Sequence, residues 1–580
     1  MAESTFQIYP EHRAAFEASL RQLGFVKEET EEPGVCHWSG RVRATWRDAA
    51  IQKPRARTHQ IGIVLKQGFP FQKPDVIPED TDPPISGERH QAAGMNGALC
   101  LYPDEGRGWE PGCTAEELVE RVRQWLVRYH NGAWAAEDFA PDLHLYFSAN
   151  GKSCLMAYGE DWSPPQGQQF GRFGVWQVVH ERAFAGNPTV GHEEPSLSHT
   201  DRLLPLLGLG NVPRNRVGLW FRLKKEPTPA DTFGEMLREI DFCVGWEQGS
   251  ARRHVRTLMG NRVPNRQSCL TIALGYPAPS GEEQWLFIQV WMRASGKKPR
   301  SYQSYDELPV RAFVTAPATE SALMRRTGHT AKYLQSKHVI LFGVGAIGSS
   351  VAMLLAKAGI ETITLVDNDV IRPGNAVRNE AGMAHVGRSK THSVGFEIWQ
   401  HAPDCAIHCE PASWDPDKLL HLVERANIII DTTANEAFSR LLNHICAKAN
   451  KTAIFATSHR SAAIGRVRII RPRRDACLEC YEECLEQSSY PKIPKGDEGA
   501  FVEGGCGVPT VEASAIDVEA IANAAARAAL HFMTGKLGDQ NECIIVNEPL
   551  ADGPDIFLER GTKWFQRSPV TDCVECSKTH

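Results

Sequence analysis

Three glycines at the end of an apolar run have the spacing of a phosphate-binding turn. The run "VILFGVGAIGSS", residues 339–350, places Gly343, Gly345 and Gly348 in a G-x-G-x-x-G pattern. Such a turn puts phosphates at a helix N-terminus, where free backbone N–H groups and the helix dipole favour anions. Asp367 ends the next apolar run, "ETITLVD", where an acidic residue holds ribose hydroxyls. At this point a nicotinamide dinucleotide and ATP fit equally well.

The polar residues that follow favour ATP. The stretch "VDNDVIRPGNAVRN" carries Asp369, Asn375 and Arg378, and Lys390 follows in "GRSK". A nicotinamide enzyme needs no such cluster just past its ribose acid, whereas a site that handles a triphosphate does, because charge develops on phosphate oxygens during transfer. Arginine offers phosphate a planar fork and lysine a point charge. The sequence therefore predicts that the glycine turn holds ATP.

Cysteine pairs near the C-terminal end predict a structural zinc site. Cys477 and Cys480 form "CLEC", and Cys573 and Cys576 form "CVEC". Two C-x-x-C pairs supply the four thiolates of a tetrahedral zinc centre. Two unrelated pairs of reduced thiols are the alternative, and Cys484 is a spare candidate ligand.

One more cysteine stands in a loop context that suits a reactive thiol. Cys506 lies in "VEGGCGVPT", and a helical stretch begins just after Pro509. A thiol ahead of a helix N-terminus can have a lowered pKa. The alternative is a small residue tolerated in a loop.

Composition bounds the class of protein. The 580 residues allow about three or four domains of ~150 residues. A formal net charge of −6 gives no basic footprint for nucleic acid, and the short cluster Arg471, Arg473 and Arg474 is expected to be a solvated loop. No apolar run approaches the ~18 residues that span a bilayer, and "MAESTFQIYPEHR" has no apolar signal core. We therefore expect a cytoplasmic protein without membrane or nucleic-acid partners, whose sixteen cysteines are mostly reduced.

Three regions must position these residues. Residues 1–147 combine a helical pattern at 13–23, strand-like runs such as "HQIGIVL", and a helix from about Thr114, where Thr114 and Glu117 form a capping box. Residues 148–318 hold short β-like runs ("FGVWQVV", "VGLWFRL", "QWLFIQVWM") and no chemical constellation, which indicates a β-rich structural or connecting domain. Residues 319–580 alternate strands and helices, which predicts a parallel, doubly wound sheet. The fold class is thus a multidomain α/β and α+β chain.

The third region resembles the ubiquitin-activating enzymes and their bacterial ThiF/MoeB relatives. The glycine turn, D-x-D, N-x-x-R and lysine follow one another in that family's order. The resemblance implies a Rossmann-like domain that uses ATP to adenylate the C-terminal carboxylate of a small protein. By resemblance Asp367 holds the ribose and Asn375, Arg378 and Lys390 hold phosphates. The resemblance also implies an arginine that reaches the site from a dimer mate, which Arg325 or Arg326 in "LMRRTGH" matches loosely. It implies that the zinc site attaches the C-terminus to the domain. It further implies a cysteine that forms a thioester, for which Cys506 is the candidate and Cys484 the runner-up.

One departure from this family concerns Mg²⁺. The family has an aspartate in a T-D-N segment after the next strand, and here "IIIDTTANEAFSR" places Ala434 at that position. Asp431 could take over, or phosphates and water hold most of the metal, which Mg²⁺ tolerates.

The first region resembles a ubiquitin-conjugating enzyme. The stretch "RHQAAGMNGALCLYPDEGRGWEPGCTAEELVERVRQWL" matches that family through residues that include a cysteine before a tryptophan, a proline and a helix: Gly97, Cys100, Leu101, Trp109, Pro111 and Thr114. Cys100 would be the thioester carrier. The family's His-Pro-Asn is broken, because His90 is followed by Gln91 and Ala92, so Asn96 or Tyr102 would have to donate to the oxyanion. The alternative is a core cysteine of an unrelated α+β domain.

Together the two regions resemble the fused activating–conjugating proteins of bacterial CBASS antiphage operons. This resemblance covers residues 1–147 and 319–580 and implies an ATP-dependent ubiquitin-like transferase. It would carry the C-terminal tail of a cGAS-like nucleotidyltransferase on Cys506 and then on Cys100, ligate it to a target lysine, and so prime antiphage defence. Two alternatives stay open: sulfur transfer as in ThiF, and a non-catalytic scaffold that binds the partner's tail, which Ala434 and the broken His-Pro-Asn favour slightly.

Overall fold

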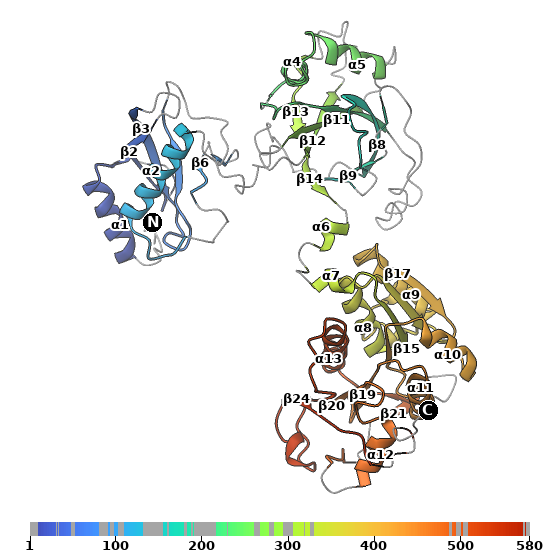
Figure 1. The fold of residues 1–580 in the computed structure, drawn as a ribbon. Helices are drawn as coiled ribbons and strands as arrows, with labels where there is room; N and C mark the ends of the chain where they lie inside the picture. The colour runs from blue at the N-terminus through green and yellow to red at the C-terminus, as the bar shows by residue number, and fades with distance from the viewer. Residues whose placement is uncertain are drawn as a thin grey trace. The chain divides into compact units, whose positions relative to one another are not determined.

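The chain forms two compact units in a computed structural model, Met1–Ala318 and Thr319–His580 (Figure 1). The structure describes residues 10–28, 30, 32, 34–47, 53–80, 91–92, 98–101, 109–131, 155–158, 162–178, 182–186, 189–190, 216–228, 230–259, 267–277, 283–293, 306–317, 320–324, 327, 330–486, 490–494, 500–502, 509–571, 573 and 575. Within these residues, no helix has the length and apolar character needed to cross a bilayer.

The first unit begins with a four-stranded antiparallel sheet in the order β1-β2-β3-β4. Its elements are α1 (Pro10–Gln22), β1 (Val26–Glu28), β2 (Cys36–Arg47), β3 (Pro54–Leu65), β4 (Asp75–Pro78), the short pair β5 (Gln91–Ala92) and β6 (Ala98–Leu99), and α2 (Ala115–Asn131). Every second side chain of β2 is buried around Trp38, Val42 and Ala44, so one face of the sheet packs on the helices. The expected capping box is confirmed: the Thr114 N–H donates to Glu117 at 2.9 Å, and the Glu117 N–H donates to Thr114 Oγ1 at 3.2 Å.

The same unit continues into an eight-stranded mixed sheet in the order β13-β12-β11-β10-β8-β9-β7-β14. Its elements are β7 (Leu155–Tyr158), β8 (Phe170–Val178), β9 (Arg182–Gly186), β10 (Arg216–Arg222), α4 (Phe233–Val244), α5 (Ser250–Met259), β11 (Gln267–Pro277), β12 (Glu283–Arg293), β13 (Val310–Ala312) and β14 (Val314–Pro317). The expected β-like runs form β8, β10 and β12. One hydrophobic core lies between the sheet and helices α4 and α5. A second, aromatic core contains Trp162, Phe173 and Phe287.

The second unit is one eight-stranded sheet in the order β17-β16-β15-β18-β19-β20-β23-β24. Its strands are β15 (His338–Phe342), β16 (Thr362–Val366), β17 (Ala406–Glu410), β18 (Ile428–Asp431), β19 (Ala453–His459), β20 (Ile464–Ile470), β23 (Glu542–Val546) and β24 (Gly561–Phe565). The first five of these in sheet order are parallel, as the alternating pattern predicts. The last three are antiparallel, and they follow the strand runs from which the parallel sheet was predicted, the last of which, "TAIFAT", lies in β19. A short hairpin joins β19 to β20, and such a connection can only pair strands antiparallel.

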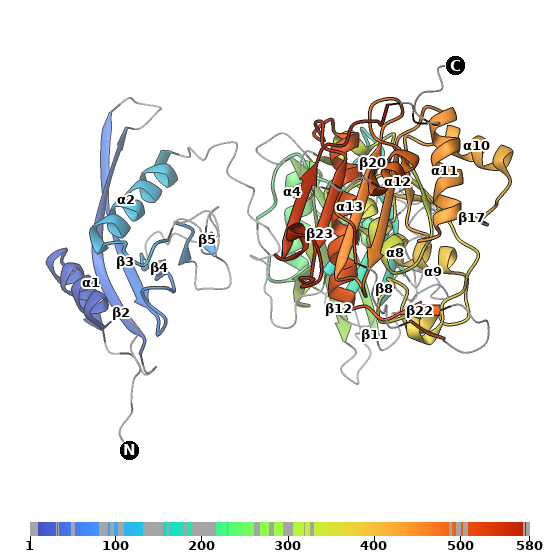
Figure 2. The same ribbon diagram turned by 90° about the horizontal axis from the view of Figure 1, so that it is seen from below.

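Helices cover both faces of this sheet (Figure 2). One face packs against α8 (Ala346–Lys357), α9 (Lys390–His401) and α13 (Ala515–Met533). The other packs against α10 (Pro416–Glu424), α11 (Glu436–Lys448) and α12 (Leu478–Glu486). Between the sheet and these layers lie buried side chains such as Leu341, Ile430 and Phe342. The result is a three-layer sandwich that holds the end of β15 rigidly at its centre.

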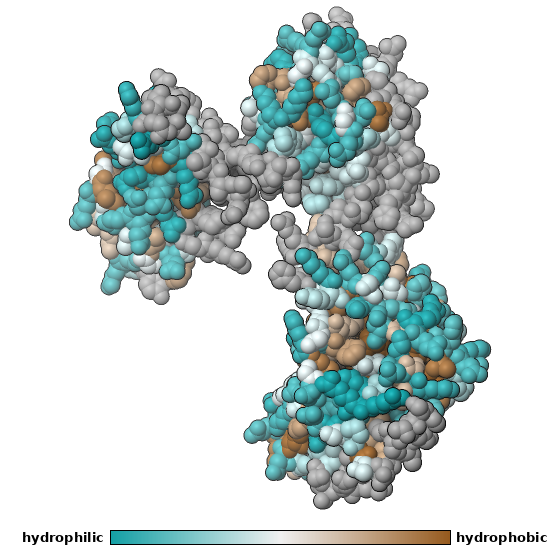
Figure 3. Space-filling view, in the orientation of Figure 1, coloured by the Kyte–Doolittle hydropathy of each residue, from teal (hydrophilic) through white to brown (hydrophobic). Residues whose placement is uncertain are grey.

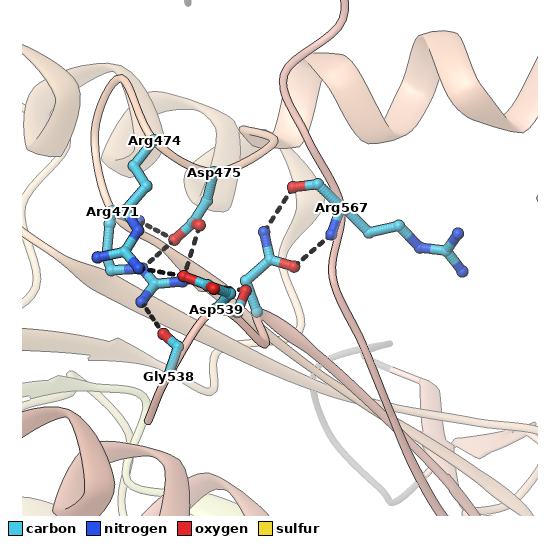
Figure 4. Close-up of polar contacts among 7 residues, drawn as sticks. Arg471, Arg474, Asp475, Gly538, Asp539 and Arg567 are labelled. Carbon is cyan, nitrogen blue, oxygen red and sulfur yellow. Dashed lines mark hydrogen bonds and ion pairs between the residues drawn. The ribbon is translucent and has the colours of Figure 1, made fainter. Parts of the chain in front are cut away.

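The arginine cluster after β20 lies in a turn where Arg473 and Arg474 are exposed, as the charge run predicts, whereas the Arg471 side chain is only 11% exposed. Arg471 is bidentate to Asp475, with hydrogen bonds of 2.6 and 2.9 Å, and it also donates to the backbone oxygens of Gly538 and Asp539 (Figure 4). Arg474 pairs with Asp539 at 2.5 Å. Arg471 thus combines a partner four residues away with two carbonyls that are 67 and 68 residues along the chain, and local charge counting cannot anticipate the distant pair. The cluster ties the end of β20 to the loop before β23.

Candidate functional site

The glycine turn lies at the point where the strand order of the sheet reverses, because the strands after β15 are first added on one side of it and then on the other. Strand β15 pairs in parallel with β16 on one side and with β18 on the other. In open α/β sheets this switch point leaves a crevice at the carboxyl ends of the strands, where ligands bind. Gly343 has a φ of +84°, and an added Cβ would lie 2.8 Å from the Thr433 backbone. Helix α8 follows directly. Its N-cap is Gly345, which has no side chain that could accept hydrogen bonds from the first backbone N–H groups of the helix.

Asp367 supports the turn from the end of the neighbouring strand. One of its carboxylate oxygens accepts the Val344 N–H at 2.7 Å, and the other accepts the Asp369 N–H at 2.8 Å. The side chain is half-buried, and each carboxylate oxygen has a second lone pair. Asp367 can therefore hold the glycine turn in place and still accept hydrogen bonds from the hydroxyl groups of a bound sugar.

Lys390 and Asp369 form an ion pair beside the turn. Lys390 Nζ lies 2.7 Å from Asp369 Oδ2, and the Lys390 N–H donates to the Asp369 carbonyl at 3.0 Å. Burial alone would raise the pKa of Asp369, but the hydrogen bond and charge of Lys390 outweigh it and hold that pKa below its usual value. Lys390 is the first residue of α9, so its cationic head is anchored at one place near the crevice.

Two residues that the sequence argument missed contact the turn directly. Asn379 donates from Nδ2 to the carbonyls of Val344, at 3.0 Å, and Gly345, at 3.3 Å. Thr432 Oγ1 donates to the Gly343 carbonyl at 2.6 Å. Asn379 directly follows Arg378 in "NAVRN", and Thr432 directly follows Asp431. Their position next to motif residues is the one sequence signal that could have found them.

The remaining motif residues differ in how they are used. Asn375 accepts the Arg372 N–H at 3.0 Å, so its side chain closes a local turn, and Arg378 is half-buried in the same segment. Asp431 is buried and accepts hydrogen bonds from the Thr433 backbone and hydroxyl and from Ser439. Burial raises the pKa of Asp431, and those hydrogen bonds oppose the rise. A metal-binding role for Asp431 would require it to exchange these bonds.

Three of the four expected zinc ligands lie together. The Sγ atoms of Cys477, Cys480 and Cys573 lie within 4.8 Å of one another, and Cys477 Sγ is 3.7 Å from each of the other two. Sulfurs at ~2.3 Å from a tetrahedral zinc ion are about 3.8 Å apart, so the spacing fits that metal. All three residues are buried, and the Val570 N–H donates to Cys480 Sγ at 3.3 Å. Cys576 lies outside the described residues.

Cys100 is an exposed cysteine directly after β6. Strand β6 pairs with β5, which places Gln91 opposite Leu99 and Ala92 opposite Ala98. The positions where the conjugating family has proline and asparagine therefore belong to a strand beside the cysteine. Desolvation of the thiol raises the pKa of Cys100, and the charge of Lys73 opposes that rise. His90, Asn96, Gly97 and Tyr102 lie outside the described residues.

Cys506, Arg325 and Arg326 lie outside the described residues. Cys506 belongs to the connection between β21 (Ala500–Val502) and β22 (Pro509–Val511), which pair antiparallel. The following helix, α13, begins at Ala515 with Ser514 as its N-cap, later than the expected start just after Pro509. Cys484 falls in α12.

Comparisons with known proteins find a family match in the second unit and relatives that are named as adenylyltransferases. The ThiF family model matches residues 320–551. The uncharacterized proteins y4oA and y4qC of Sinorhizobium fredii are 24% and 25% identical; the matches cover 83% and 90% of this chain and 84% and 88% of theirs. The ATP-dependent ubiquitin transferase-like protein Cap2 of Enterobacter hormaechei is 24% identical over 46% of this chain and 47% of its own. The probable adenylyltransferase/sulfurtransferase MoeZ of Mycobacterium tuberculosis is 31% identical over 22% and 33%.

Among solved structures, E. coli MccB with ATP is similar, with a TM-score of 0.34 and 20% identity over 43% of this chain and 69% of that one. A TM-score this low supports no inference about function. The match to the ThiF family model and the relatives named as adenylyltransferases are independent of it.

Proposed function

We propose that this chain uses ATP to activate the C-terminal carboxylate of a partner protein. The observation that carries the proposal is the braced glycine turn at the switch point, with Asp367 beside it and the Lys390–Asp369 pair at its edge. A carboxylate oxygen attacks the α-phosphorus of ATP, the bond to the bridging oxygen breaks, and pyrophosphate leaves with that electron pair. Backbone N–H groups of α8 face the phosphates, and Arg378 and Lys390 offset the developing charge.

Magnesium would accompany the nucleotide at this site. Mg²⁺ supplies charge neutralisation to the phosphates and keeps several waters, so it needs few protein ligands. Asp431 is the proposed ligand because Ala434 has no donor atom. Asn375 completes the proposed phosphate contacts, and Asp369 holds Lys390 in reach of them.

After activation, we propose that the acyl group moves through two thioesters. The Cys506 thiolate attacks the adenylate carbonyl and AMP leaves; the Cys100 thiolate then attacks the thioester and frees Cys506. A lysine amine of the target finally attacks the Cys100 thioester, forms an amide and releases the thiol. Each exchange replaces one difficult step by easier ones. The exposure of Cys100 supports its role as the second carrier, since a target amine must reach it.

The proposed partner is a cGAS-like nucleotidyltransferase that offers its C-terminal tail, as in the CBASS systems that the chain resembles. Cap2 is named as an ATP-dependent ubiquitin transferase-like protein, which supports a ubiquitin-like transfer reaction. The domain roles follow the sequence: residues 1–147 conjugate, residues 148–318 connect, and residues 319–580 activate. Zinc on Cys477, Cys480, Cys573 and Cys576 would hold the C-terminal segment in place. His444 supports the same closure, because its Nδ1 lies 3.0 Å from Glu575.

We also propose a homodimer through the second unit, in which Arg326, or else Arg325, reaches the partner copy's nucleotide. Apolar side chains are exposed on the segment between β16 and α9 and in the middle of α9: Val370, Val377, Met383, Val386 and Phe396. Figure 3 shows apolar side chains at the surface of this unit among hydrophilic ones. Val377 is 75% exposed and Met383 65%, which is unfavourable for a surface facing water and suits an interface.

The experiment that tests the activation step is ATP–pyrophosphate exchange with the partner protein. Arg378→Ala and Lys390→Ala should abolish exchange, because phosphate charge is left uncompensated in the transition state. Lys418→Ala is the matched control, since the Lys418 side chain is 75% exposed on α10. Exchange at the wild-type rate in both site variants would reject the assignment.

The order of the two thiols is tested by gels run with and without reductant. Cys506→Ala should still release pyrophosphate and carry no partner on any thiol. Cys100→Ala should accumulate a reductant-sensitive adduct on the second unit and form no amide product. If Cys506→Ala still charges Cys100, the relay is wrong, and transfer through Cys484 or directly from the adenylate to Cys100 replaces it.

A second candidate function is sulfur transfer to the activated carboxylate, which the adenylyltransferase/sulfurtransferase relatives favour. It needs the adenylation site but no conjugating cysteine. Under this reading Cys100→Ala would leave product formation intact, and the product would be a thiocarboxylate rather than an amide. Mass spectrometry of the partner's tail separates the two outcomes.

A further inference from the structure

A group of arginines, one buried and two partly exposed, lies on the antiparallel strands of the sheet in the second unit, away from the glycine turn. Arg466 and Arg468 alternate with Val467 along β20, so both point to the face that carries α12. Glu542 on β23 is directly opposite Arg468 in the strand register. Figure 2 shows β20, β23 and α12 in this half of the unit. We call this group, with Arg567, Tyr481 and Tyr490, the Arg466 cluster.

The charges of the cluster do not balance. Three guanidinium groups surround one carboxylate, which leaves two positive charges without a counter-charge within the cluster. Glu542 is fully buried and accepts from Tyr490 at 2.5 Å and from Arg567 Nε at 3.0 Å. Its nearest approach to Arg468 is 3.9 Å. Buried charges in proteins are normally paired, so the excess is costly for Arg466, which is buried, and less so for the partly exposed Arg468 and Arg567.

Hydrogen-bond donors in the cluster are also left over. Within the residues that the structure describes, Arg466 Nε, Arg468 Nε and the Tyr481 hydroxyl are buried and have no hydrogen-bond partner. Arg466 is 3% exposed and Tyr481 0%. The guanidinium carbon of Arg468 lies 4.6 Å from the Tyr481 ring centre, so two of the three are neighbours. Arg466 uses its other nitrogens on Tyr490 and on the Pro491 carbonyl.

We propose that the Arg466 cluster is a binding site for an oxyanion, either an inorganic phosphate-type anion or a carboxylate. The groups without partners are donors, so their complement is a ligand rich in acceptor oxygens. Water would accept hydrogen bonds from these donors but would leave the excess positive charge. An anion would accept the hydrogen bonds and also offset that charge. The Arg468 and Arg567 side chains are 16% and 27% exposed, so the cluster reaches the surface on that side.

The geometry argues against other ligand classes. A metal ion would meet two excess positive charges, and an apolar ligand would leave the three donors without partners. Planar guanidinium groups suit carboxylate and phosphate oxygens in particular. The inference does not depend on the proposed function, because the cluster contains no residue of the glycine turn and neither of the two cysteines proposed to form thioesters.

Tyr481→Phe is the sharpest test, because it removes a hydroxyl that bonds no described residue. We expect this variant to be as stable as the wild type in chloride. Calorimetric titration of the full chain with sodium phosphate, and separately with sodium acetate at the same ionic strength, measures anion binding. Loss of one hydrogen bond to a charged ligand should weaken binding about tenfold or more. Arg468→Met should weaken it further, and Arg474→Met, an exposed arginine paired with Asp539, is the control.

Phosphate can also bind at the glycine turn, so the titrations are repeated in the Arg378→Ala, Lys390→Ala background. Binding that survives there and falls with Tyr481→Phe supports the proposal. The anion that binds more tightly, phosphate or acetate, identifies the ligand source. Binding that is absent for both anions, unchanged in Tyr481→Phe, or lost only in the Arg378→Ala, Lys390→Ala background would overturn it.

Discussion

Gly345 and Gly348 stand three residues apart in the same turn, yet the structure predicts opposite consequences for replacing each with alanine. A Cβ on Gly348 would lie 1.9 Å from the Gly343 carbonyl oxygen and 2.5 Å from Thr432 Oγ1. A Cβ on Gly345 would have nothing within 4 Å, and its φ of −82° suits any residue. Gly348 is therefore required by packing, and Gly345 leaves open the space that a nucleotide would fill.

The two substitutions are expected to change the free energy of unfolding by different amounts. Alanine inside a helix is normally favoured over glycine by about 1 kcal/mol, so Gly348→Ala would stabilise α8 if there were room. The contact is with a backbone oxygen that cannot rotate away, and overpacking of this kind costs about 1–3 kcal/mol. The net loss is therefore expected to be up to about 2 kcal/mol. At the N-cap, Gly345→Ala should change stability by less than about 1 kcal/mol, because a weaker cap is offset by a stiffer unfolded chain.

Hydrogen exchange of the full chain measures both effects locally. Gly348→Ala should speed exchange in peptides from β15 and α8 and leave the first unit unchanged, since stability is a local property. Gly345→Ala should keep wild-type protection but weaken ATP binding by calorimetry. Gly348→Ala with full protection and full ATP affinity would refute the packing argument. Gly345→Ala with unchanged ATP affinity would refute the placement of the nucleotide over that glycine.

Three further predictions concern metal, pH and assembly. Elemental analysis should find about one zinc per chain, lost in Cys477→Ser and kept in Cys446→Ala, a buried cysteine outside the cluster; a fully folded, zinc-free protein would reject the site. Burial, with Arg466 and Arg468, lowers the pKa of His459 from 6.5 to about 4. The unfolded chain then binds the proton before the folded chain does. The contribution of His459 to the free energy of unfolding is therefore complete above pH 6.5 and is lost as the pH falls toward 4, by at most about 3 kcal/mol. His459→Asn should make the stability measured in urea titrations less dependent on pH over this range. Val377→Asp should convert a dimer to monomers in light scattering, whereas Val26→Asp in the first unit, 67% exposed, should not; identical masses for both would contradict the interface.

Local sequence signals were sufficient for the elements around the turn. The sequence predicted a strand, a turn and a helix from the apolar run before Gly343, the spacing of the glycines and the residues that follow. The structure has β15 and α8 at these positions, with the turn between them. The capping box at Thr114 and Glu117 is also local, because both partners lie within one helical turn. The C-x-x-C pairs located three cysteines that the fold brings within 4.8 Å.

Long-range contacts escaped the sequence argument. Asn379 and Thr432 hold the turn from two other segments, and neither residue type is diagnostic when read alone. The antiparallel half of the sheet was missed because strand direction depends on the connection and on which edge the strand joins. Arg471 was expected to be solvated because two of its partners, the Gly538 and Asp539 carbonyls, are far along the chain.

The sequence by itself determined the chemistry that the second unit can offer, since residue types and their spacing define which groups can meet a phosphate or a metal. Only the tertiary structure decided how each group is used. It paired Lys390 with Asp369, turned Asn375 and Asp431 toward their own loops, and gathered three arginines around Glu542. Spacing constrains neighbours within one element, whereas the distance between residues on different strands is set by sheet order and register, which depend on the packing of the whole unit.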